Sequence, residues 1–125
     1  MQVMRGGDYR IYAPGVDPAA RNRMIAICHE VRSMGLPLYV VEVMRTPARQ
    51  LKLFFTGATP LKFPVYHGRG RALDVAWCIK GRVTYAVPEW YWGAYGEACK
   101  RHGMEWGGLW RGRYRDFPHC QLRRK

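Results

Sequence analysis

One carboxylate lies inside an otherwise apolar, strand-like segment of this chain. Residues 72–79 read ALDVAWCI, and their alternation gives the large apolar side chains one shared face. Asp74 falls on the opposite face, between Ala72 and Ala76. An ionised carboxylate in such a strand needs a partner, and a cation or a metal ion would supply one. The small neighbours leave room for it, so the segment predicts a strand with a cation or metal site against it.

The surrounding pattern predicts an α+β fold, with a small, mainly antiparallel sheet packed against about three helices. Asp17 followed by Pro18 is a typical helix start, and Gly35 ends the apolar repeat that follows. Helices are expected over residues 18–34, 47–55 and 88–102, and strands over 38–44, 72–79, 83–86, 104–106 and 119–122. Residues 1–16, 57–70 and 107–116 are expected to be irregular.

Length and composition limit the classes of protein. The 125 residues suit one domain, expected over 1–125 without a separate wall-binding domain. The longest apolar run, residues 36–44, is too short to cross a membrane, and no signal peptide is visible. Four scattered cysteines are expected to be reduced thiols. The formal charge of +12 favours an anionic partner, such as nucleic acid, anionic lipid or an anionic cell wall.

Further metal-binding side chains lie at a distance in the sequence. His67 sits in a glycine-flanked loop, and the stretch DFPH brings Asp116 and His119 just before the last predicted strand. Two histidines and one aspartate make a three-ligand zinc site with a fourth position open to water. An additional carboxylate beside that position is the general base that metal-assisted hydrolysis requires.

The order of these motifs resembles the VanY-like and L-alanyl-D-glutamate peptidases, within the zinc D-alanyl-D-alanine peptidase group. The resemblance extends over about residues 20–122. It rests on His67-x-x-Gly70-x-Ala72-x-Asp74, on Trp106-Gly107-Gly108 with Trp110, on Asp116-x-x-His119, and on Arg45-Thr46-x-x-x-Gln50.

The resemblance implies a role for each matching residue. His67, Asp74 and His119 would hold one zinc ion, and Asp116 would be the general base. Arg45 would polarise the scissile carbonyl or hold the substrate. Gln50 would face the cleft, and the motif Trp106-Gly107-Gly108 would shape its floor. The family usually has a serine two residues before the first ligand, where this chain has Val65.

The implied activity is hydrolysis of peptidoglycan stem peptides by a monomeric enzyme. Cleavage between L-Ala and D-Glu, as in phage endolysins, is the first expectation, and D-alanyl-D-alanine carboxypeptidase activity is the alternative. An endolysin would be made in the host cytoplasm and act in the periplasm or wall, held there by its positive charge. A non-enzymatic nucleic-acid-binding module is the second class. It would use the charge and the 14% aromatic content, but no helix-turn-helix, zinc-finger or RNP-like pattern is present.

Three neighbouring residues have simpler interpretations. Cys120 follows His119, but strand alternation turns it to the opposite face, into the core. Glu105 is a rival to Asp116 as the base, although an exposed surface carboxylate is the expectation. Glu42 is expected on the solvent face of its strand.

Overall fold

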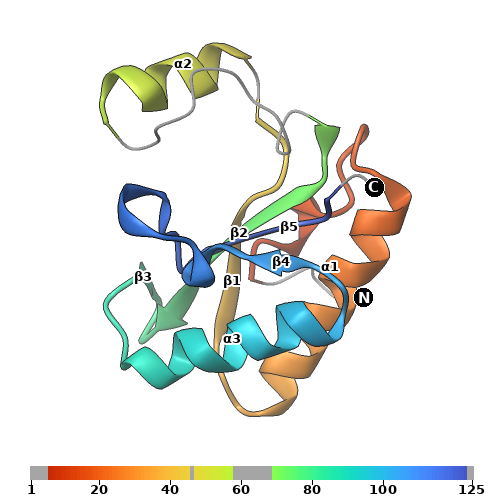
Figure 1. Cartoon of the computed structure of the whole chain (residues 1–125). Helices are drawn as coiled ribbons and strands as arrows, with labels where there is room; N and C mark the ends of the chain where they lie inside the picture. Colours follow the sequence, from red (N-terminus) through yellow and green to blue (C-terminus); the bar gives the residue numbers. More distant parts are fainter. Residues whose placement is uncertain (1–5, 46, 58–68, 124–125) are drawn as a thin grey trace.

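The computed structural model describes residues 6–45, 47–57 and 69–123 (Figure 1). The helices are α1 (Pro18–Ser33), α2 (Pro47–Phe55) and α3 (Glu89–Arg101), with short 3-10 turns η1 (Asp8–Arg10), η3 (Gly107–Leu109) and η4 (Gly112–Tyr114). The strands are β1 (Leu38–Glu42), β2 (Ala72–Ile79), β3 (Arg82–Thr84), β4 (Glu105–Trp106) and β5 (His119–Gln121). The predicted α+β class is confirmed. Residues 107–114, expected to be irregular, form two 3-10 turns.

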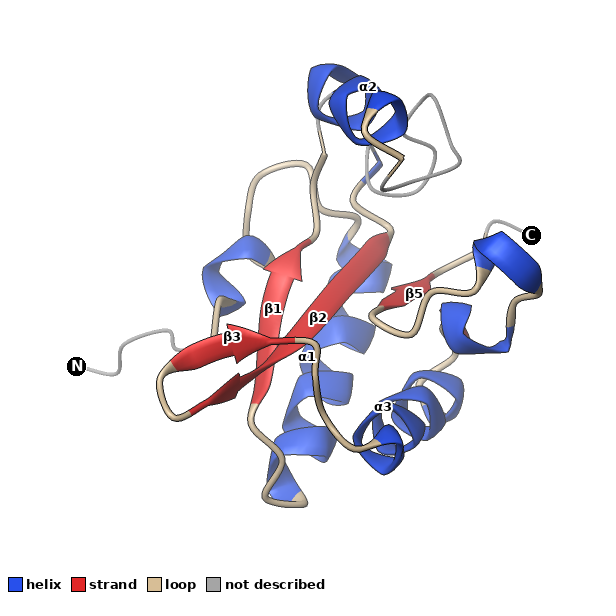
Figure 2. Ribbon diagram, turned by 90° about the vertical axis from the view of Figure 1, so that its left-hand side faces the viewer, coloured by secondary structure: helices blue, strands red, loops and turns tan. Residues whose placement is uncertain are grey.

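The five strands form one sheet in the order β1-β2-β5-β4, and β3 also pairs with β2. Each of these pairings is antiparallel. Helices α1 and α3 lie on one side of the sheet, and α2 stands beyond the end where β1 finishes and β2 begins (Figures 1 and 2). The other face of the central strands is therefore not covered by α1 or α3.

The start of α1 follows from its first residues. The Asp17 carboxylate accepts a hydrogen bond of 2.9 Å from the Ala19 N–H, and Pro18 occupies the first turn. At the other end Gly35 has φ +83°, and its N–H donates to the Arg32 carbonyl. The apolar face between these ends is buried at Ala20, Met24, Ile27, Cys28 and Val31.

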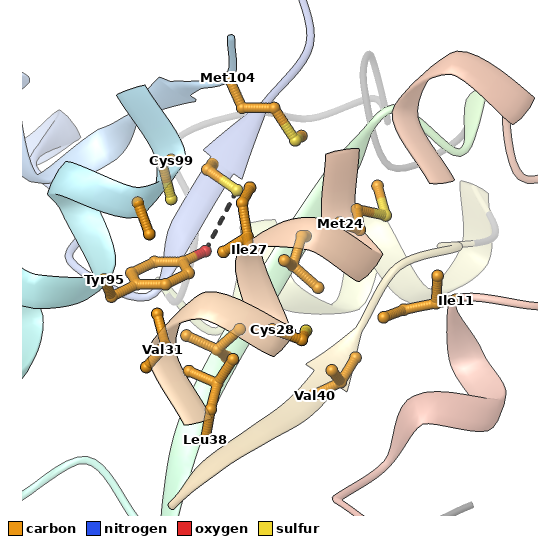
Figure 3. Close-up of a cluster of buried hydrophobic side chains, with 14 of the residues drawn as sticks. Ile11, Met24, Ile27, Cys28, Val31, Leu38, Val40, Tyr95, Cys99 and Met104 are labelled. Atoms are coloured by element: carbon orange, nitrogen blue, oxygen red, sulfur yellow. Dashed lines mark hydrogen bonds between the residues drawn. The ribbon is translucent and has the colours of Figure 1, made fainter. Parts of the chain in front are cut away.

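The core lies between this helical layer and the sheet. Figure 3 shows Ile27 and Val31 of α1 beside Tyr95 of α3, which is fully buried. Leu73, Val75 and Trp77 of β2 are also fully buried, as the alternation of residues 72–79 predicted. All four cysteines are free, and Cys78 is the one that is not fully buried. No helix in the described ranges is long and apolar enough to cross a membrane.

Strand β1 contains a bulge. Val40 pairs with Val75, but the next paired residue of β1 is Glu42, opposite Asp74, so Val41 is an extra residue. Strict alternation would put Glu42 on the same face as the buried Val40. The bulge instead places it beside Asp74, which is how bulges redirect side chains near functional sites. The expectation that Glu42 lies on a solvent face is therefore wrong: its side chain is 17% exposed and ion-paired.

Candidate metal centre

Asp74 and His119 meet because their strands pair in register. The antiparallel β2–β5 ladder sets the two residues directly opposite each other, so their side chains leave the same face of the sheet. His119 Nδ1 lies 2.9 Å from Asp74 Oδ1. Two residues that are 45 positions apart thus form one polar pair, as the sequence predicted for two of its three ligands.

Asp116 completes the cluster from the turn before β5. Its N–H donates to the Gly107 carbonyl, and its own carbonyl accepts from the His119 N–H at 3.2 Å. One ligand atom from each of Asp74, Asp116 and His119 lies within 4.8 Å of the others. Two carboxylates and an imidazole at this spacing suit a divalent metal ion, and zinc accepts both donor types. These donors therefore fit the predicted zinc ion, with Asp116 close enough to ligate or to act as a base.

Two predicted site residues lie partly or wholly beyond what the structure describes. His67, the third predicted ligand, lies outside the described residues, as does Val65. Gln50 belongs to α2, but its side chain is likewise outside the description. Gly70 of the same motif is buried, has φ +65°, and a Cβ there would lie 2.5 Å from Val16 Cα. The motif glycine therefore allows the chain to pass close to residues 15–17, just before α1, on its way into β2.

The electrostatics of the cluster favour a bound cation. Burial disfavours the charged imidazole, but the hydrogen bond and negative charge of Asp74 outweigh it and raise the pKa of His119 to about 9. The pKa of Tyr85 is also raised, by its own burial and by the charges of Asp74, Asp116 and Glu42. The site is therefore locally negative, although the whole chain is positive.

Arg45 contacts the cluster from the side of β1. Its Nε and one terminal nitrogen bind the two carboxylate oxygens of Glu42 at 2.9 and 3.1 Å. The same terminal nitrogen lies 3.2 Å from Asp74 Oδ2, and the Arg45 side chain is only 10% exposed. Arg45 thus engages one oxygen of Asp74 while the other faces His119. A direct role of Arg45 in holding substrate stays a prediction.

Trp106 and Gly107 support the turn that carries Asp116. The Trp106 indole N–H donates to the Phe117 carbonyl at 2.9 Å, and the two rings are in contact. A Cβ at Gly107 would lie 2.6 Å from the Asp116 carbonyl oxygen, so only glycine allows this approach. The two residues therefore fix the DFPH segment, while their predicted contact with substrate stays a prediction.

The Trp106 ring packs directly against Gly96 of α3, so a methyl group added at Gly96 would displace it. A Cβ at Gly96 would lie 2.3 Å from the Trp106 ring, whereas one at Gly93 meets nothing within 4 Å. We expect Gly96→Ala to cost about 1–3 kcal/mol through overpacking. On the same helix, Gly93→Ala should stabilise by up to about 1 kcal/mol through helix propensity. Denaturant unfolding of both variants measures this, and equal stabilities would contradict the packing described for Trp106.

Glu105 is not part of the cluster. Its two oxygens bind Gln121 Nε2 at 3.1 Å and Arg123 Nε at 2.8 Å, and its side chain is 33% exposed. Glu105 was expected to be an exposed surface carboxylate, but it is partly buried and bound by two side chains. Cys120 is fully buried next to the Tyr95 hydroxyl, so its placement in the core is confirmed.

Comparison with known proteins supports the same chemistry. A family model described as D-alanyl-D-alanine carboxypeptidase matches residues 65–122, the part of the chain that contains the candidate ligands. Among solved structures, the L-Ala D-Glu endopeptidase ChiX of Serratia marcescens is similar with a TM-score of 0.73 and 24% identity. The match covers 98% of this chain and 90% of that one. No curated protein sequence gives a significant match.

These findings agree with the motifs read from the sequence. The family match falls on the strand and the turn that bring Asp74, Asp116 and His119 together. The shared fold extends along nearly the whole chain. The family match over residues 65–122 and the shared fold support the resemblance to the VanY-like, D-alanyl-D-alanine peptidase group, and they favour the enzymatic interpretation over the nucleic-acid-binding one.

Proposed function

We propose that this chain is a zinc-dependent peptidoglycan hydrolase that cleaves stem peptides between L-Ala and D-Glu. The observation that carries the proposal is the cluster of Asp74, Asp116 and His119 within 4.8 Å, inside the segment that matches the peptidase family. His67 serves as the remaining zinc ligand in this proposal. The structurally similar protein of Serratia marcescens is an L-Ala D-Glu endopeptidase, which favours this bond over others.

Each residue of the site has a distinct task in peptide hydrolysis. His67, Asp74 and His119 would hold the zinc ion, which would supply a Lewis acid for the scissile carbonyl and would lower the pKa of a bound water to about 7. Asp116 accepts the proton of the attacking water and delivers it to the leaving amine. Arg45 binds Glu42 and Asp74, orients the Asp74 carboxylate, and presents positive charge at the edge of the site. Gln50 would face the substrate, whereas the Trp106 ring packs against Gly96 of α3 and supports the turn that carries Asp116.

The bond that is cut separates this proposal from carboxypeptidase activity. Purified peptidoglycan fragments with pentapeptide stems are digested and analysed by mass spectrometry. Endopeptidase cleavage leaves the sugar carrying only L-Ala and releases the rest of the stem as one peptide. Loss of a single terminal alanine instead would make the enzyme a D-alanyl-D-alanine carboxypeptidase. Intact stems after incubation with zinc-loaded protein would reject both.

We also propose that the enzyme acts as a phage endolysin, made in the host cytoplasm and active in the periplasm or wall. Its formal charge of +12 would hold it on an anionic surface by screened attraction. The Debye length falls from about 8 Å at 0.15 M salt to about 3 Å at 1 M. We expect high salt to release the protein from isolated walls while hydrolysis of a soluble stem peptide continues. Retention on walls at 1 M salt would contradict the electrostatic anchor.

A further inference from the structure

A row of polar side chains crosses the sheet on the face away from α1 and α3. Glu42 of β1 lies opposite Asp74 of β2, which lies opposite His119 of β5. Two residues further along β5, Gln121 lies opposite Glu105 of β4. Because side chains two apart in a strand share a face, His119 and Gln121 point the same way. The row thus continues beyond the metal cluster.

Gln121 is bound directly to the candidate ligand. Its Oε1 lies 2.7 Å from His119 Nε2, the ring nitrogen that does not face Asp74. Of the described residues, His119 and Gln121 are the two buried polar side chains, with 8% and 5% exposure. A buried amide can face His119 with either its oxygen or its NH2 group. The hydrogen bonds to its other partners decide which of the two it presents.

The orientation of Gln121 follows from the charges next to it. Glu105 Oε2 accepts a hydrogen bond of 3.1 Å from the amide NH2 of Gln121. The other carboxylate oxygen of Glu105 is paired with Arg123 Nε at 2.8 Å. The Gln121 oxygen must then face His119, and this oxygen can accept but not donate. His119 Nε2 therefore carries a proton.

From this chain of contacts we infer that Gln121, held by Glu105, is a positioning residue that commits His119 to bind the metal through Nδ1. Gln121 Oε1 accepts the Nε2–H and keeps that proton in place, so the proton that leaves when a metal binds is the one on Nδ1, on the side of Asp74 and Asp116. Metal-bound histidines generally donate their other N–H to such a partner, and loss of the partner weakens metal binding by about 10- to 100-fold. The inference rests on the proposed zinc site.

The test compares zinc affinity in two variants. One removes the hydrogen-bond acceptor for His119 Nε2, and the other keeps an acceptor there. Gln121→Met keeps the length of the side chain but removes the acceptor, so zinc should bind about 10- to 100-fold more weakly in chelator competition. The double variant Glu105→Gln with Gln121→Glu exchanges the carboxylate and the amide between positions 105 and 121. The new residue 121 still accepts from His119 Nε2, and the new residue 105 can donate to it and accept from Arg123. This variant should bind zinc at least as tightly as the wild type.

A second readout reports the bound nitrogen itself. In zinc-loaded wild-type protein, nitrogen-15 NMR of the His119 ring should show a protonated Nε2 and a metal-bound Nδ1. The His119 signals are assigned by their absence in a His119→Gln variant. Equal zinc affinity of wild type and Gln121→Met, weak binding by the double variant, or zinc on Nε2 would overturn the inference. Absence of zinc binding by the wild type would instead reject the zinc site on which it rests.

Discussion

Replacing His119 with alanine is expected to remove stoichiometric zinc from the protein and to abolish hydrolysis of peptidoglycan. His119 is 8% exposed and lies 2.9 Å from Asp74, so it forms the buried side of the cluster. Three protein ligands hold a catalytic zinc, and removal of one leaves an incomplete site. Elemental analysis after loading and dialysis should fall from about one ion per chain to almost none.

The controls separate metal loss from unfolding. His29 is exposed on α1, so His29→Ala should retain full zinc content. Because His119→Ala leaves a buried gap, Asp74→Asn provides a second variant that keeps the side-chain shape but removes the anionic ligand. Circular dichroism identifies folded samples of each. A folded His119→Ala protein that still holds one equivalent of zinc would contradict the assigned site.

Asp116→Asn is expected to keep zinc and to lose turnover. The backbone bonds that place Asp116, from its N–H to Gly107 and from its carbonyl to His119, do not involve the side chain. The variant should therefore retain its fold and its metal while it loses a proton acceptor. Loss of a general base lowers kcat by about 10²- to 10⁴-fold. Stopped assays on a soluble stem peptide, together with zinc analysis of the same sample, measure both quantities.

The control for this variant is another carboxylate on the surface. Glu97 of α3 has a side chain that is 59% exposed and pairs only weakly with Lys100, at 3.4 Å. Glu97→Gln should leave turnover unchanged. If Asp116→Asn lysed outer-membrane-stripped cells as fast as the wild type, Asp116 would not be the base.

The elements that depend on local patterns could be predicted from the sequence. Asp17 and Pro18 specify the start of α1, because the capping hydrogen bond to Ala19 and the proline in the first turn involve only neighbouring residues. The alternation of residues 72–79 placed Asp74 opposite the buried Leu73 and Val75. The pairing of Asp74 with His119 was reached differently, through the order of family motifs, because strand register over 45 residues is not encoded locally.

The features that depend on sheet irregularity were missed. Nothing in the stretch LYVVE indicates that Val41 is an extra residue, so the position of Glu42 beside Asp74 could not be anticipated. The position of Gln121 could have been predicted from the sequence. It follows the predicted ligand His119 by two residues on a predicted strand, so the two side chains share one face of the sheet. Its anchor, Glu105, depends on the pairing of β4 with β5, which only the structure supplies.

Anomalous diffraction at the zinc edge, from crystals of the zinc-loaded protein, tests the account most directly. We expect one peak bonded to Asp74 and His119 at roughly 2.0–2.2 Å, with the imidazole of His67 as the third protein ligand. A peak elsewhere, or imidazoles of residues 67 and 119 too far apart to share an ion, would contradict the metallopeptidase site.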